Sequence, residues 1–195
     1  MTVTSYWPQP FLILNYYRQS LESLDLLKRH VLAALVDGQV IDTTLTASFR
    51  SMTPAEVDSS IGQLRDELHH AVVLMLVAAF EATLQTDLRA RLSRKGKDAA
   101  SRRFRKLWHS RYKRRGADEW VRIEAILDVW KSVIGRADII GDFKQLVMFR
   151  HWLAHGRYWV QKSGLSNDFD PFDAWERGKA LFDTLPGFAP LPQSH

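Results

Sequence analysis

Residues 53–92 decide the fold, and they read TPAEVDSSIGQLRDELHHAVVLMLVAAFEATLQTDLRARL. The first four, Thr53-Pro54-Ala55-Glu56, form a strong helix start: a capping threonine, a proline at the first helical position and a glutamate at the third. From Val57 to Met75 apolar residues recur at steps of three and four, and the pattern continues towards Leu92. The stretch therefore predicts one very long helix, or two helices joined by a bend.

The same stretch contains the most apolar run of the chain, residues 71–80, bounded by His70 and Glu81. A membrane-spanning helix needs about 20 apolar residues, so this run predicts a buried core helix and no membrane association. The chain has no cysteine, which excludes disulfides and thiolate chemistry. Its N-terminus lacks the pattern of a signal peptide. We therefore expect a cytoplasmic protein.

Helical periodicity recurs on both sides of the long helix. It predicts further helices over residues 14–35, 118–134, 138–156 and 170–181; Gly116 with Asp118, Asp138 and Asp170 are the expected starts of the last three. Within the basic stretch, Ala100, Phe104, Leu107 and Trp108 form a narrow apolar stripe that predicts a helix with basic outer faces. No repeat or linker divides the chain. We predict an all-α protein, a bundle of about five helices with one long central helix, in a single domain over residues 1–195, with a loosely ordered tail at 185–195.

Charge is unevenly distributed along the chain. Residues 89–115 hold 13 of the 27 Lys and Arg residues but a single acid, Asp98, while the remainder holds 14 basic and 21 acidic residues. One basic face on an otherwise acidic body favours a polyanionic partner, although a solvated surface is the simpler alternative. The candidate RNA-binding residues are Arg102, Arg103, Arg105, Lys106, Arg111 and Lys113.

A second decisive stretch is FRHWLAHGR at residues 149–157. Arg150 lies on the apolar stripe of its predicted helix, so its guanidinium needs an anionic partner. His155 lies near the helix C-terminus, where the backbone dipole favours an imidazolium. A fixed cation beside a titratable histidine is the minimum needed to cleave a phosphodiester without a metal. The alternative is a structural ion pair and a capping histidine.

Glu81 interrupts an otherwise apolar stripe of the long helix, which also carries Leu74, Val77 and Leu84. Each of Glu81 and Arg150 is thus a charge on an apolar face, and pairing them is the least costly way to bury either. We predict that the two side chains lie in contact.

The Arg-x4-His-Gly pattern of Arg150, His155 and Gly156, together with Phe80-Glu81 on the preceding long helix, resembles the HEPN superfamily of small helical domains, and within it the RiboL-PSP-like members. The resemblance covers about residues 55–160. It implies a metal-independent endoribonuclease with Arg150 and His155 as the catalytic pair, His151 as an auxiliary where the family often has Asn, and Glu81 as the orienting partner. It implies a homodimer without cofactor, in a toxin–antitoxin or defence system with an antitoxin or other partner protein.

Two other functions stay open. The family includes members that bind nucleotides or proteins without catalysis, so a non-catalytic interaction domain is the first alternative. The second is a metal-dependent enzyme, because His151 and His155 have the i, i+4 spacing of metal ligands and His69 or His70 could supply a third.

A homodimer is also expected from the residues themselves. Phe149, Trp152 and Trp159 add aromatic surface around Arg150, and aromatic residues and arginine are enriched at protein interfaces.

Overall fold

The computed structural model describes residues 9–37, 47–94, 96–112, 121–155, 169–188 and 191. Every element in these ranges is helical, which confirms the all-α prediction and the long central helix, with six α-helices where about five were expected. The elements are α1 (Pro10–Val36), the 3₁₀ turn η1 (Ala47–Phe49), α2 (Pro54–Arg94), α3 (Ala99–Leu107), the π-helical turn η2 (Trp108–Tyr112), α4 (Ile123–Ile134), α5 (Ala137–Ala154) and α6 (Pro171–Thr184).

Helix α2 is a single unbroken helix of 41 residues. It begins with the predicted capping box: the backbone N–H of Thr53 donates to a carboxylate oxygen of Glu56 at 2.7 Å, and the N–H of Glu56 donates to Oγ1 of Thr53 at 3.3 Å. The reciprocal pair satisfies backbone groups that the first turn would otherwise leave without partners.

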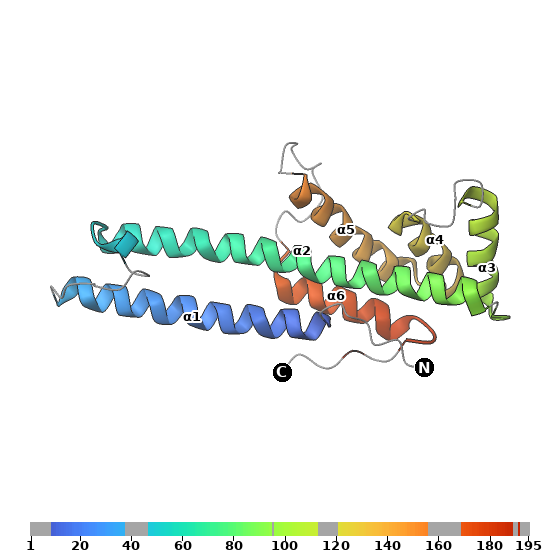
Figure 1. Cartoon of the computed structure of the whole chain (residues 1–195), viewed down its shortest axis with the longest axis horizontal. Helices are drawn as coiled ribbons and strands as arrows, with labels where there is room; N and C mark the ends of the chain where they lie inside the picture. Colours follow the sequence, from blue (N-terminus) through green and yellow to red (C-terminus); the bar gives the residue numbers. More distant parts are fainter. Residues whose placement is uncertain are drawn as a thin grey trace.

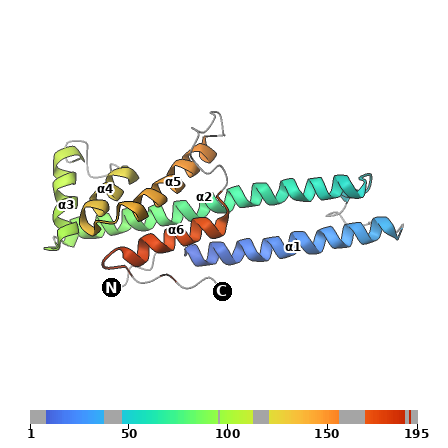
Figure 2. The ribbon, with the colours of Figure 1, turned by 180° about the vertical axis from the view of Figure 1, so that it is seen from behind.

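The other helices are arranged along α2 (Figure 1). Helix α1 runs antiparallel to the first half of α2, and the two form a long arm. Helices α3 to α6 gather around the second half and form a wider body, as the view from behind also shows (Figure 2). The body contains the main core, whose largest fully buried side chains include Phe80, Trp130, Phe143 and Trp175. The arm has a separate, much smaller cluster around Val31 and Ile61.

Helix boundaries in the last third differ from the prediction in two places. Helix α4 begins at Ile123, and the expected opening at Gly116 and Asp118 lies outside the described residues. Helix α5 begins at Ala137 with Arg136 as its N-cap, whereas Asp138 was expected to cap it. Asp138 instead lies in the first turn, where its carboxylate pairs with the Arg136 guanidinium at 2.7 Å. The prediction for α6 is confirmed, since Asp170 caps it through two backbone N–H groups.

The start of the tail is packed, although residues 185–195 were predicted to be loosely ordered. Leu185 is buried, and the ring of Phe188 lies 5.0 Å from that of Phe182 and 6.1 Å from that of Trp130. Arg91 also donates to the carbonyl oxygen of Pro186 at 3.0 Å. Two apolar side chains that reach the core hold the first four residues of the tail in place.

By length and composition, α2 is the one described helix that could cross a membrane. The sequence predicts no span, because its uninterrupted apolar run, residues 71–80, is only ten residues long. In this fold 50% of the apolar window of α2 is buried inside the protein.

The two sides of the arm differ: one carries ion pairs, and the other has a groove lined by apolar side chains and by Gln19, Ser20 and Ser23. On one side two ion pairs join the helices: Lys28 with Asp58 at 3.1 Å, and Arg65 with Asp25. On the other side α1 and α2 border a groove of about 540 Å³. Its apolar lining consists of Tyr16, Leu24, Leu27, Leu64 and Leu68.

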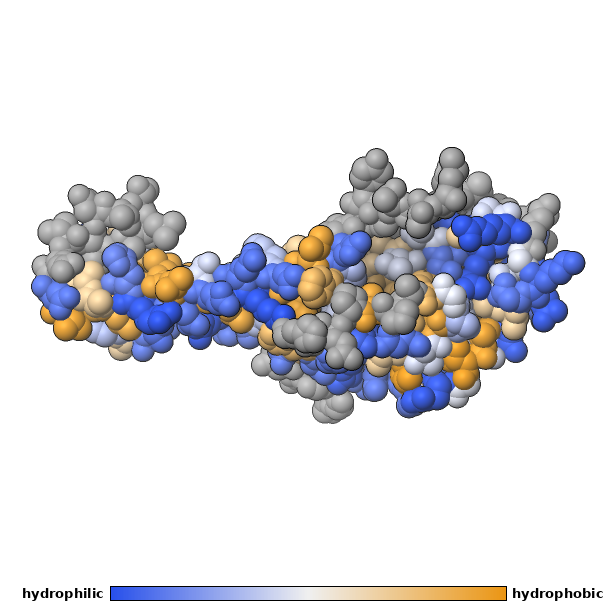
Figure 3. Space-filling view, turned by 90° about the horizontal axis from the view of Figure 1, so that it is seen from below, coloured by the Kyte–Doolittle hydropathy of each residue, from blue (hydrophilic) through white to orange (hydrophobic). Residues whose placement is uncertain are grey.

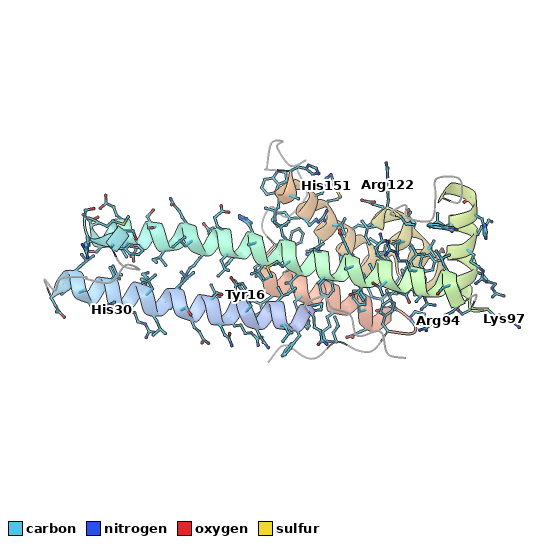
Figure 4. All side chains as sticks on the ribbon, viewed as in Figure 1. Tyr16, His30, Arg94, Lys97, Arg122 and His151 are labelled. Atoms are coloured by element: carbon cyan, nitrogen blue, oxygen red, sulfur yellow. The ribbon has the colours of Figure 1, made fainter. Side chains whose placement is uncertain are left out.

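Figure 4 shows Tyr16 where this groove meets the body, and the space-filling view shows hydrophobic residues scattered among hydrophilic ones on the narrow arm (Figure 3). Beyond the small buried cluster around Val31 and Ile61, the arm leaves the apolar lining of this groove open, where a third or fourth helix would pack.

Close packing of α6 on α2 depends on Gly178. A Cβ atom at this position would overlap the ring of Phe80, whereas a Cβ at Gly141 of α5 would meet nothing within 4 Å. We predict that Gly178→Ala lowers the free energy of unfolding by about 1–3 kcal/mol through overpacking. Gly141→Ala should raise it by about 0.5–1 kcal/mol, because alanine loses less backbone entropy in a helix. Urea denaturation followed by circular dichroism measures both. Equal effects of the two substitutions would contradict the packing described.

Candidate functional site

Arg150 and Glu81 are in contact, as predicted from the sequence. Nη2 of Arg150 lies 3.4 Å from Oε2 of Glu81, so the pair joins α5 to the middle of α2. The side chain of Glu81 is 13% exposed and that of Arg150 is 33% exposed. The pair is therefore half-buried, with the guanidinium on the solvent side, where it retains access to a ligand.

Burial dominates the electrostatics of Glu81. Loss of hydration raises the pKa of this carboxyl, the Arg150 guanidinium lowers it, and the carboxylate of Glu124 on α4 raises it further. The second oxygen, Oε1, is buried and has no hydrogen-bond partner within the described part of the chain. Glu124 was not among the predicted site residues, because it occupies the first turn of α4, where acidic residues are common for helix-dipole reasons alone.

His151 and His155 lie on the exposed side of the C-terminal end of α5. Their ring centroids are 4.3 Å apart, and the backbone N–H of His155, the C-cap residue, donates to the carbonyl oxygen of His151 at 3.1 Å. Figure 4 shows His151 at this end of the helix, pointing away from the body. The structure thus places both histidines at the C-terminal end of α5, as the sequence predicted.

Arg150 and His155 project from different faces of α5. Five residues correspond to a rotation of about 140° around a helix axis. Arg150 faces α2 and Glu81, whereas His155 is exposed at the helix end. By their spacing, the two predicted catalytic residues share one end of α5 but leave it in different directions.

The two histidines that could complete a metal site are engaged elsewhere. The ring of His69 packs edge-on against Tyr17 at 5.3 Å, and that of His70 lies 6.3 Å from the ring of Phe149. In the residues described, no group of three His, Asp or Glu side chains has the arrangement of a metal site. His151 and His155 therefore have no third protein ligand within this part of the chain.

The predicted RNA-binding residues divide into three groups. Arg102, Arg103 and Lys106 are exposed on α3, and Arg105 is half-buried. The side chain of Arg111 and the whole of Lys113 lie outside the described residues. Helix α3 stands at the far end of α2, and α4 lies between it and the C-terminal end of α5 (Figure 1). The structure therefore does not bring the basic face and the two histidines together.

Not every cation in the basic stretch is available to a ligand. Arg91 is 15% exposed, pairs with Asp87 at 2.8 Å and with Asp98 at 3.0 Å, and stacks over the ring of Trp130 at 4.9 Å. Its guanidinium connects α2, α3 and α4. Part of the positive charge that the sequence assigned to a partner is used to hold the body together.

Comparisons with family models, with curated proteins and with solved structures gave no match.

The raised pKa of Glu81 sets the sign of a pH effect. Folded protein binds this proton more tightly than unfolded protein, so the contribution of Glu81 to stability is fully present below the usual pKa of 4.5 and is lost as pH rises through the raised value. We predict that wild type gains stability relative to Glu81→Gln as pH falls from neutrality to 4.5.

Urea denaturation of both proteins across this range measures the difference. Asp87, whose pKa is also raised by burial, is present in both proteins, so its titration cancels. If wild type instead loses stability relative to Glu81→Gln in acid, the attraction of Arg150 outweighs the cost of burial and our assignment of the dominant effect is wrong.

Proposed function

We propose that this protein is a metal-independent endoribonuclease of the HEPN type, acting in the cytoplasm as a component of a toxin–antitoxin or defence system. The observation that carries the proposal is the contact between Glu81 and Arg150. A buried carboxylate that contacts only one edge of a guanidinium orients it while leaving its outer edge open to solvent. The planar fork of arginine matches two phosphate oxygens and keeps its charge at any physiological pH.

His155 is the proton-transfer residue of the proposed reaction. It removes the proton from a ribose 2′-hydroxyl, whose oxygen then attacks the adjacent phosphorus. The bond to the 5′-oxygen of the next nucleotide breaks, and that oxygen takes up the proton that His155 had accepted. The products are a 2′,3′-cyclic phosphate and a 5′-hydroxyl. Arg150 stabilises the charge that develops on the phosphorane, and His151 assists beside it.

Two chains are needed for this assignment. Because Arg150 and His155 project from different faces of α5, a second α5 packed against the first would supply one of them across the interface. One argument from the sequence does not support this dimer: Phe149 is buried in its own chain, with its ring 5.6 Å from Trp152 and 5.2 Å from Phe169. Trp159 lies outside the described residues.

A non-catalytic interaction domain is the second candidate, and the open groove of the arm favours it. A long antiparallel helix pair with an exposed apolar face is a common way to bind a partner helix. In this alternative, Arg150 and Glu81 only hold α5 on α2, and His155 is a capping residue. The metal-dependent alternative requires a third ligand from residues that the structure does not describe.

Cleavage of RNA in excess chelator distinguishes these candidates. We predict that wild type cleaves and that His155→Ala reduces the rate by about 10²–10⁴, the usual contribution of a general acid–base group. His30→Ala, at an exposed position on the distant arm, is the matched control and should leave the rate unchanged. Circular dichroism establishes equal folding. Equal cleavage by His155→Ala and wild type would assign the activity to another site. If wild type cleaves RNA only after zinc is added, the metal-dependent alternative is favoured.

Dimer formation has its own test on the arm. We predict a light-scattering mass near twice that of the 22.5 kDa chain at micromolar concentration. Leu64 and Leu26 are both exposed leucines of the arm, at 47% and 60%, but only Leu64 lines the apolar groove. If two arms pair through their grooves into a four-helix bundle, Leu64→Glu gives the mass of a monomer and Leu26→Glu leaves the dimer intact. A dimer that survives both substitutions would place the interface outside the groove of the arm. A wild-type protein with the mass of a monomer would contradict the predicted dimer itself.

A further inference from the structure

A second groove lies between α3 and α4, in the body of the protein, and has a volume of about 440 Å³. Its floor is apolar and is formed by Leu107 of α3 and by Ala125 and Val129 of α4. A floor of this kind can bind the face of a nucleic-acid base, which is apolar above and below its ring.

The two sides of this groove differ in charge. Arg103 and Lys106 provide cations on the α3 side, both side chains are exposed, and neither forms an ion pair with another described residue. Asp128 lies on the α4 side, where it pairs with Lys144 at 2.6 Å and is still 64% exposed. A groove with cations on one side and a carboxylate on the other does not suit a simple polyanion, because Asp128 would repel it.

Two hydroxyl groups strengthen this polarity. Oγ of Ser132 on α4 donates to the carbonyl oxygen of Val129 at 2.7 Å, and Oγ of Ser110 in η2 donates to that of Leu107 at 3.1 Å. Each hydroxyl hydrogen is therefore used within its own helix, and the lone pairs remain as acceptors towards the groove that both serines line. The two serine oxygens and the carboxylate of Asp128 are all acceptors. The groove is therefore suited to a ligand that carries hydrogen-bond donors as well as negative charge.

We infer that this groove binds one nucleotide of single-stranded RNA, with its phosphate on Arg103 and Lys106 and a donor group facing Asp128. The donor is the ribose 2′-hydroxyl or the exocyclic amine of a base such as cytosine, from either of which a carboxylate can accept a hydrogen bond. Duplex nucleic acid fits less well, because its bases are stacked and cannot lie on the apolar floor. The inference rests on the part of the proposed function that makes RNA the ligand, and is independent of cleavage.

Binding is measured by fluorescence anisotropy on the full chain carrying His155→Ala, so that cleavage does not consume the probe. The probes are twelve-residue oligomers of cytidine RNA, uridine RNA, which lacks an exocyclic amine, and deoxycytidine DNA, which lacks the 2′-hydroxyl. Arg103→Gln with Lys106→Gln should weaken binding of the cytidine RNA by about tenfold or more. It should also make the logarithm of the binding constant fall less steeply with the logarithm of salt concentration, by about 0.7 in slope for each phosphate that the variant no longer neutralises.

The matched control removes the same charge from the same part of the body. Arg122→Gln with Lys131→Gln also replaces one arginine and one lysine, both exposed on or beside α4, and neither lines the groove. Its effect on affinity should stay below about twofold, since neither side chain lines the groove and salt screens solvent-exposed charges. Equal losses for the two pairs would mean that only net positive charge matters, and would overturn the inference.

Asp128→Asn distinguishes nucleotide binding in the groove from simple charge attraction, because the two predict different changes in RNA affinity. If the groove binds a nucleotide, the substitution abolishes the preference of the protein for cytidine RNA over whichever probe lacks the donor that faces Asp128. If binding is only charge attraction, removal of a carboxylate strengthens all three probes together, and the inference fails. Catalysis does not enter these measurements. A groove that behaves as expected in a protein that never cleaves RNA would overturn the proposed reaction and leave the binding site standing.

Discussion

The structure depends on one constraint: α2 is too long and too apolar to be covered by any single neighbour. Its first half is covered on one side by α1 alone, and its second half by helices that approach from several directions. One of these approaches, that of α6, brings Gly178 directly over the ring of Phe80. Phe80 in turn packs against Phe143 of α5 at 6.0 Å. The position of α5, and hence of Arg150 next to Glu81, follows from how aromatic side chains fit around this point of α2.

Local signals were enough to predict those parts of the fold that local chemistry controls. The capping box at Thr53 and Glu56 and the cap at Asp170 act within four residues, so the pattern of the sequence contains the whole interaction. The pairing of Glu81 with Arg150 could also be predicted, because a charge on an apolar stripe has few ways to be buried. Leu185 and Gly178 could not be placed, since their environment consists of residues far away in the sequence. Periodicity shows that a face is buried, but not which helix covers it.

At the candidate site, too, the sequence pattern does not show which distant residues surround a side chain. Spacing along α5 correctly placed Arg150 towards the core and His155 at the helix end, but spacing does not show that a buried carboxylate keeps a raised pKa despite its cation. The reason is geometric: at 3.4 Å and with the guanidinium open to water, the attraction of Arg150 is too weak to offset the lost hydration of Glu81. Glu124, whose carboxylate adds to the effect, comes from a helix that no local pattern places beside α2.

Separation of the basic face from the two histidines constrains how one RNA strand could use both. Helix α4 lies between them, and its exposed side carries both signs of charge, with the carboxylate of Asp128 held by Lys144 of α5. A strand held at the α3–α4 groove would therefore have to cross α4 and α5 before it reached His155 of the same chain. In the proposed dimer, where one α5 packs against another, the strand would instead reach His155 of the second chain across that interface. Under the proposed function, the α3–α4 groove and the dimer interface together determine whether an RNA strand bound at one end of the body reaches the end of α5.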